Sequence, residues 1–98
     1  MMVTKMTLKP AEELGPVLAG RNVAASLRDR VEAALGRGEE VLLDFDGVDA
    51  MSPSFADELF AKLSVRPGPG NDRVRFEHLR DDQIALVEYV LRGRPSSE

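Results

Sequence analysis

Apolar and polar residues follow regular patterns along this chain, and three segments carry the patterns of strands. Residues 2–8 and 73–77 alternate between apolar and polar side chains, which predicts strands with one face exposed to water. The continuous apolar run from Val41 to Leu43 predicts a central strand covered on both faces. The chain is therefore expected to contain one short sheet.

Three other segments carry apolar residues at helical spacing. A helix is predicted over residues 22–35. Asn22 is its expected N-cap, and Gly36 and Gly38 are expected to end it. A second helix is expected over residues 55–64 and a third from Asp81 or Asp82 to residue 92. The predicted core positions of the three helices are Leu27, Val31, Ala34 and Leu35; Phe55, Leu59 and Leu63; and Ile84, Val87 and Leu91.

The remaining segments are predicted to connect these elements. Residues 10–20 and 66–71 are rich in Pro and Gly, and residues 93–98 form a polar C-terminal tail. The resulting order, β-α-β-α-β-α, predicts one small α/β domain over residues 1–92. Because the outer strands alternate, we expect the helices to lie mainly on one face of the sheet, leaving the other face for water or for docking.

Composition narrows the classes of function. The chain has 98 residues, a formal net charge of −4 and no Cys. The acidic balance argues against nucleic acid as the main ligand, and the missing Cys excludes thiolate metal sites. We expect a cytoplasmic protein without a membrane span. A domain this small buries a modest core, so stabilisation by a partner or by a second copy in a homodimer is expected.

Asp44 and Asp46 suggest one enzymatic alternative. The segment from Val41 to Val48 resembles the first motif of haloacid-dehalogenase-type phosphohydrolases, an apolar strand ending in Asp-x-Asp-Gly-Val. By that resemblance Asp44 is the nucleophile and Asp46 the acid/base of a Mg²⁺-dependent phosphohydrolase. The alternative is that both side chains fix the turn through hydrogen bonds to the backbone.

The longest informative segment is Leu43 to Phe60, with the sequence LDFDGVDAMSPSFADELF. It resembles the signature of the STAS-like domains of unknown function, and Gly20-Arg21 before an Ala-rich helix also fits. The resemblance covers about residues 15–92 and implies a single STAS-like α/β domain. This family is similar in turn to the STAS antagonists of anti-sigma factors, so the resemblance implies a non-enzymatic bacterial signalling module.

The antagonists bind a histidine-kinase-type ATPase, and phosphorylation of a Ser after the central strand releases it. This resemblance implies a protein partner of that class or another regulator. Pro53 stands where the antagonists carry their Ser, and Ser52 and Ser54 flank it as candidates for phosphorylation. Ser54 is also predicted to cap the helix that follows, with Asp57 three positions later in a variant of the capping box.

We expect the partner to be bound where the central strand meets the second helix. The candidate residues are Asp46, Asp49, Ser52, Ser54, Asp57 and Glu58. Asp57 and Glu58 complement the helix dipole and are candidates to pair with Arg21 or to contact the partner. No catalytic residue, metal or cofactor is expected in this interpretation.

Other polar residues are assigned ordinary roles. His78 is the only His and is expected to lie on the surface without a second ligand beside it. Arg66, Arg73, Arg75 and Arg80 give the C-terminal third basic character, and we interpret them as solvated positions. The alternative is that Arg73 and Arg75, which share one strand face, meet an acidic partner.

Overall fold

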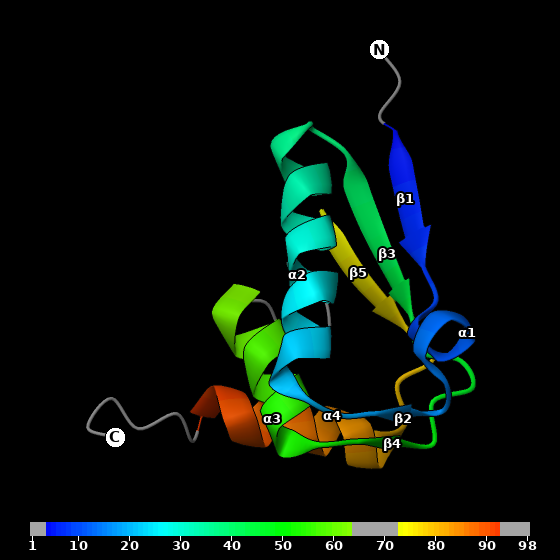
Figure 1. The fold of residues 1–98 in the computed structure, drawn as a ribbon, viewed down its shortest axis with the longest axis vertical. Coiled ribbons are helices and arrows are strands. Elements are labelled where there is room, and N and C mark those ends of the chain that lie inside the picture. The colour runs from blue at the N-terminus through cyan, green and yellow to red at the C-terminus, as the bar shows by residue number, and fades with distance from the viewer. Residues whose placement is uncertain (1–3, 64–72, 93–98) are drawn as a thin grey trace.

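The computed structural model describes residues 4–63 and 73–92 (Figure 1). The predicted connection over residues 66–71 and the predicted tail over residues 93–98 lie outside this part. The elements are, in order, β1 (Lys5–Leu8), α1 (Pro10–Leu14), β2 (Val17–Leu18), α2 (Arg21–Gly36), β3 (Glu40–Asp44), β4 (Ala50–Met51), α3 (Pro53–Ala56), the π-helical turn η1 (Asp57–Ala61), β5 (Val74–Glu77) and α4 (Asp81–Arg92). The predicted α/β class is confirmed, and the predicted order gains α1, β2 and β4.

The main sheet has three parallel strands in the order β1-β3-β5, so β3 is central as predicted. Each crossover between parallel strands is right-handed as a rule, and both crossovers here advance in the same direction across the sheet. They must therefore place their helices on the same face. Figure 1 shows α2 and α3 on one side of the sheet, as the alternating outer strands predicted.

The face of the sheet opposite the helices is open. In β3, Val41 and Leu43 are buried, whereas Leu42 between them is only half-buried. Lys5 and Arg75 lie beside Leu42 around a shallow depression on this face. The prediction that β3 is covered on both faces is therefore wrong, because the apolar run includes Leu42 although helices cover only one side.

The segment predicted as a connection over residues 10–20 contains two regular elements. Pro10 is the first residue of α1, where its missing N–H costs no hydrogen bond. The backbone carbonyl of Pro16 accepts hydrogen bonds from the N–H groups of Asp49 (2.7 Å) and Ala50 (3.2 Å), and so begins the pairing of β2 with β4. This small second sheet brings the start of α2 beside the start of α3.

Helix α2 begins at Arg21, after Gly20, rather than after Asn22 as predicted. Gly20 has a φ of +94°, a conformation that suits glycine, so the chain turns into the helix two residues earlier. Ala24, Leu27, Val31 and Ala34 are buried, and Leu35 is half-buried. The predicted stripe is thus confirmed at three positions and extended by Ala24.

Helix α4 begins at Asp81, but its buried face differs from the predicted one. Val87 is buried as expected, whereas Ile84 and Leu91 are half-buried, and Gln83 and Val90 are buried instead. The amide group of Gln83 explains this difference in the buried face of α4. It accepts a hydrogen bond from the N–H of Arg80 (2.9 Å) and donates one to the carbonyl of Val48 (3.0 Å). A buried side chain with both groups paired costs little, so a polar residue can occupy a core position.

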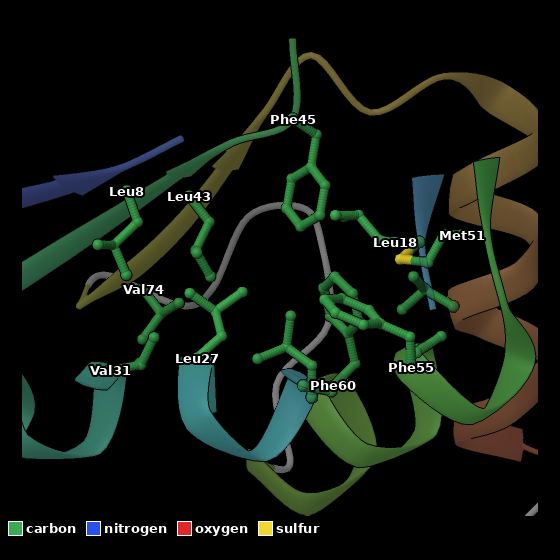
Figure 2. Close-up of a cluster of buried hydrophobic side chains, with 14 of the residues drawn as sticks. Leu8, Leu18, Leu27, Val31, Leu43, Phe45, Met51, Phe55, Phe60 and Val74 are labelled. Carbon is green, nitrogen blue, oxygen red and sulfur yellow. The ribbon is translucent and has the colours of Figure 1, made fainter. Parts of the chain in front are cut away.

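The core lies between the main sheet and the helices, and Figure 2 shows Phe45 and Phe60 in it. The rings of Phe45, Phe60 and Phe76 are in mutual contact. The Phe60 ring centre lies 5.9 Å from that of Phe45 and 5.0 Å from that of Phe76. Phe55, Leu59 and Phe60 are buried, whereas Leu63, predicted to be inward, is half-buried. The rings join η1 to β5 and to the end of β3.

Candidate functional site

The helix after the central strand is capped by Ser52, not by Ser54. The Ser52 Oγ accepts a hydrogen bond from the N–H of Phe55 (3.1 Å), and Pro53 follows at the first helical position. The predicted capping box of Ser54 with Asp57 is therefore wrong, because Ser54 already lies inside the first turn. Its Oγ lies 3.2 Å from the Ser52 Oγ, so the two candidate serines are brought together.

Replacing Ser52 by alanine is expected to lower the free energy of unfolding by about 1 kcal/mol, because the N–H of Phe55 loses its acceptor. Urea unfolding followed by circular dichroism measures the change. Ser54→Ala is the matched control and should cost less, since Ser54 accepts no backbone N–H here. Equal losses in the two variants would contradict this assignment of the cap.

Asp57 and Glu58 meet the side chains of α2 in a network of ion pairs. Arg21 Nη1 lies 3.0 Å from Asp57 Oδ2 and 3.3 Å from Glu58 Oε1, which confirms the predicted pairing with Arg21. Arg28 also pairs with the Glu58 carboxylate, and Lys62 Nζ lies 3.4 Å from it. Glu58 is only 7% exposed, so these three cations compensate a carboxylate that is largely removed from water.

Arg28 contacts both the backbone and the side chain of Glu58, which lies in the π-helical turn η1. A π-helical turn interrupts the ordinary pattern of helical hydrogen bonds, and Arg28 Nη1 donates to the backbone carbonyl of Glu58 (3.2 Å) as well as to its carboxylate. The hydrogen bond from Arg28 lowers the pKa of Glu58 below its ordinary value, against the opposing effect of burial. Sequence reasoning missed Arg28. The only signal for it in the sequence is that this charged residue stands one helical turn after Ala24.

Asp46 and Asp49 belong to a different part of the surface, in the turn after β3. The Asp44 Oδ1 accepts the N–H of Asp46 (3.0 Å). The prediction that the side chains of Asp44 and Asp46 fix the turn is therefore confirmed for Asp44. The carbonyl of Asp49 accepts from Arg80 Nη2 (2.6 Å), while the residues Asp46 and Asp49 are exposed. The six predicted residues thus fall into two groups, one at this turn and one at the start of α3 and η1.

His78 has a partner that the sequence did not predict. Its Nδ1 lies 2.7 Å from the Asp44 Oδ1, at the ends of β5 and β3.

Among residues 4–63 and 73–92, no group of three or more His, Cys, Asp or Glu residues is arranged to hold a metal ion. In the same part of the chain, no helix is long and apolar enough to cross a membrane.

Two of the basic residues in the C-terminal third bind backbone carbonyls instead of standing free in water. Arg73 Nη2 donates to the carbonyls of Leu35 (2.7 Å) and Glu39 (3.1 Å), and Arg80 Nη1 donates to that of Val48 (3.1 Å). The solvated role predicted for Arg73 and Arg80 is therefore incomplete. Arg66 lies outside the described residues.

Three exposed apolar side chains belong to α1, β2 and the first turn of α2, a feature that sequence reasoning missed. Leu14, Val17 and Val23 are 41%, 59% and 38% exposed. Leu14 and Val23 line a groove between α1 and α2, together with the ion pair of Glu13 and Arg30. The sequence carried a weak signal, because Leu14 and Val17 belong to no predicted periodic segment.

Comparison with known proteins gives one match. A family model described as a STAS-like domain of unknown function matches residues 23–83, which is more than half of the chain. No curated protein and no solved structure matches. The matched segment runs from the first turn of α2 to the first turn of α4, so it includes β3, the turn with Asp46, and Glu58 with its partners Arg28 and Lys62. Asp57 is included as well, whereas its partner Arg21 lies just before the matched segment.

Proposed function

Since this chain belongs to the STAS-like domains of unknown function, we propose that it is a bacterial protein–protein interaction module that acts in signalling and is not an enzyme. The contact surface that we propose, named the α2–α3 surface, consists of Leu14, Val17, Arg21, Val23, Ser54 and Asp57. The observation that carries the proposal is the groove lined by the exposed Leu14 and Val23 at the start of α2, the helix whose first residue, Arg21, is held by Asp57.

The composition of the α2–α3 surface supports this role. Protein interfaces commonly combine an apolar centre with a polar rim, and isolated domains rarely leave large side chains together in water without a use for them. Val17 and Val23 supply exposed apolar area, and Arg21 with Asp57 supplies a charged pair at its edge. Because Arg21 is already held by Asp57, little side-chain freedom is lost when a partner binds.

Ser54 is the better of the two candidates for phosphorylation. The Ser52 Oγ already accepts the N–H of Phe55 as the helix cap, so this oxygen is engaged in holding the helix start. Ser54 is half-buried in the first helical turn, near the positive end of the helix dipole. We propose that a phosphoryl group on Ser54 adds negative charge next to Asp57 and weakens partner binding.

A kinase-type ATPase is the partner class that we propose to test first, on the similarity of the family to the STAS antagonists. The enzymatic alternative, a Mg²⁺-dependent phosphohydrolase that uses Asp44 and Asp46, has less support. Asp44 already holds the N–H of Asp46 and the ring of His78. Hydrolysis of a generic phosphate ester that needs Mg²⁺ and is lost in Asp44→Asn would favour that alternative.

Substitution of Val17 by aspartate is expected to weaken binding of the native partner about tenfold or more, as for an interface residue worth about 1.4 kcal/mol. The partner is first captured from native lysate with the tagged full chain, with and without ATP–Mg²⁺, and identified by mass spectrometry. Affinity is then measured with the purified partner by titration calorimetry.

Tyr89→Asp is the matched control, because Tyr89 is an exposed large side chain on α4, outside the α2–α3 surface. It should bind like the parent chain. Equal binding by the Val17 variant and the parent would show that the proposed surface is wrong. A partner that is lost only when ATP–Mg²⁺ is present would support the phosphorylation switch, and Ser54→Ala should then retain it.

A further inference from the structure

The connection between β5 and α4 holds His78 in an unusual backbone conformation. His78 has a φ of +64°, and among the described residues it is the only one besides glycines with a positive φ. This region is unfavourable for residues with a Cβ atom, although His adopts it more often than most. Such a conformation persists where surrounding contacts fix it, so the contacts of His78 are informative.

Those contacts converge on one carboxylate oxygen. The Asp44 Oδ1 receives both the N–H of Asp46 (3.0 Å) and the Nδ1 of His78 (2.7 Å). The carbonyl of Glu77 also accepts the N–H of Phe45 (2.9 Å). The imidazole therefore joins the β5–α4 connection to the turn that follows β3.

We propose that His78 is a pH-sensitive latch between the β5–α4 connection and the turn after β3, so that its protonation sets how firmly the Asp46 backbone is held. A charged imidazolium forms a charge-assisted hydrogen bond with Asp44, which is stronger than the bond from a neutral ring. The latch is a regulatory feature of the isolated chain and does not depend on the proposed partner.

The charged groups around the ring determine the direction of the effect. The hydrogen bond with Asp44 raises the pKa of His78 above its ordinary value of 6.5, and the charges of Asp46 and Glu77 act in the same direction. The N–H of Asp46 and then the ring of His78 lower the pKa of Asp44, and the charge of Lys9 adds to this. The contribution of His78 to stability is thus complete below pH 6.5 and is lost as the pH rises through its raised pKa.

The test is an NMR titration of the full chain from about pH 5 to about pH 9, following the His78 ring and the amide of Asp46. We expect the ring to titrate with a midpoint above 6.5 and the Asp46 amide to shift with the same midpoint. In parallel, the thermal unfolding midpoint of the parent should exceed that of His78→Asn at low pH, and the gap should narrow as the pH rises.

Two variants serve as controls. His78→Asn keeps a residue that tolerates positive φ but removes the titrating group, so the transition at Asp46 should vanish. Asp44→Asn keeps the shape and removes the charge, so the midpoint of His78 should fall toward 6.5. The proposal is overturned if the Asp46 amide does not follow the His78 ring, or if its transition persists in His78→Asn.

Discussion

Replacing Phe60 by alanine is expected to lower the free energy of unfolding by about 3–5 kcal/mol, the range for removing a buried aromatic side chain. Phe60 is 0% exposed, and its ring contacts those of Phe45 and Phe76. The substitution therefore leaves a cavity between η1 and the ends of two strands. The total free energy of unfolding of a small domain is about 5–15 kcal/mol, so the expected loss is a large part of it.

Urea unfolding followed by circular dichroism measures this change. Tyr89→Ala is the matched control, since Tyr89 is an aromatic residue exposed on α4 and should change the free energy of unfolding by less than about 0.5 kcal/mol. If both variants lost the same small amount, the packing of Phe60 described above would be contradicted. Variants of the α2–α3 surface should resemble the control, which keeps binding defects separable from unfolding.

Replacing Gln83 by alanine is expected to lower the free energy of unfolding by about 1–3 kcal/mol, the cost of leaving buried polar groups without partners. Gln83 is 3% exposed. Its loss removes the acceptor of the Arg80 N–H and one of two donors to the Val48 carbonyl, the other being Arg80 Nη1. The variant should therefore loosen α4 from the turn after β3.

Gln83→Met separates the hydrogen bonds from the volume of the side chain. Methionine fills a similar space but makes neither bond, so we expect most of the loss to remain. Hydrogen exchange of the Ile84 amide, which donates to the Arg80 carbonyl (2.9 Å), gives a local measure of the same change. A methionine variant as stable as the parent would show that Gln83 contributes packing alone.

The sequence predicts well those features that depend on neighbours along the chain. Alternation located β5, and helical spacing located the inner face of α2, because both patterns report which side of a single element is buried. The start of α3 was also readable in principle, since Ser52 before Pro53 is the usual order of an N-cap and a first helical residue. Choosing Ser54 instead misplaced the cap by two residues.

Contacts between distant segments were not predictable in the same way. His78 meets Asp44, and Arg28 meets Glu58, only because parallel strands and one helix–helix contact bring them together. Periodicity does not state which elements become neighbours. Of the polar contacts between distant segments described here, only that of Arg21 with Asp57 and Glu58 was anticipated, through the resemblance of the segment from Leu43 to Phe60 to a known family.

The parallel pairing of β3 also constrains how the chain folds as it is synthesised. Val41 pairs with Met6 on one side and Val74 on the other, and each partner lies about a third of the chain away. Such non-local pairs slow folding, because the chain loses the entropy of closing a long loop before the contacts between the strands form. A nascent chain that ends before β5 has one edge of β3 unpaired and lacks the ring of Phe76 beside Phe60. We therefore expect folding on the ribosome to finish only after residue 77 has emerged.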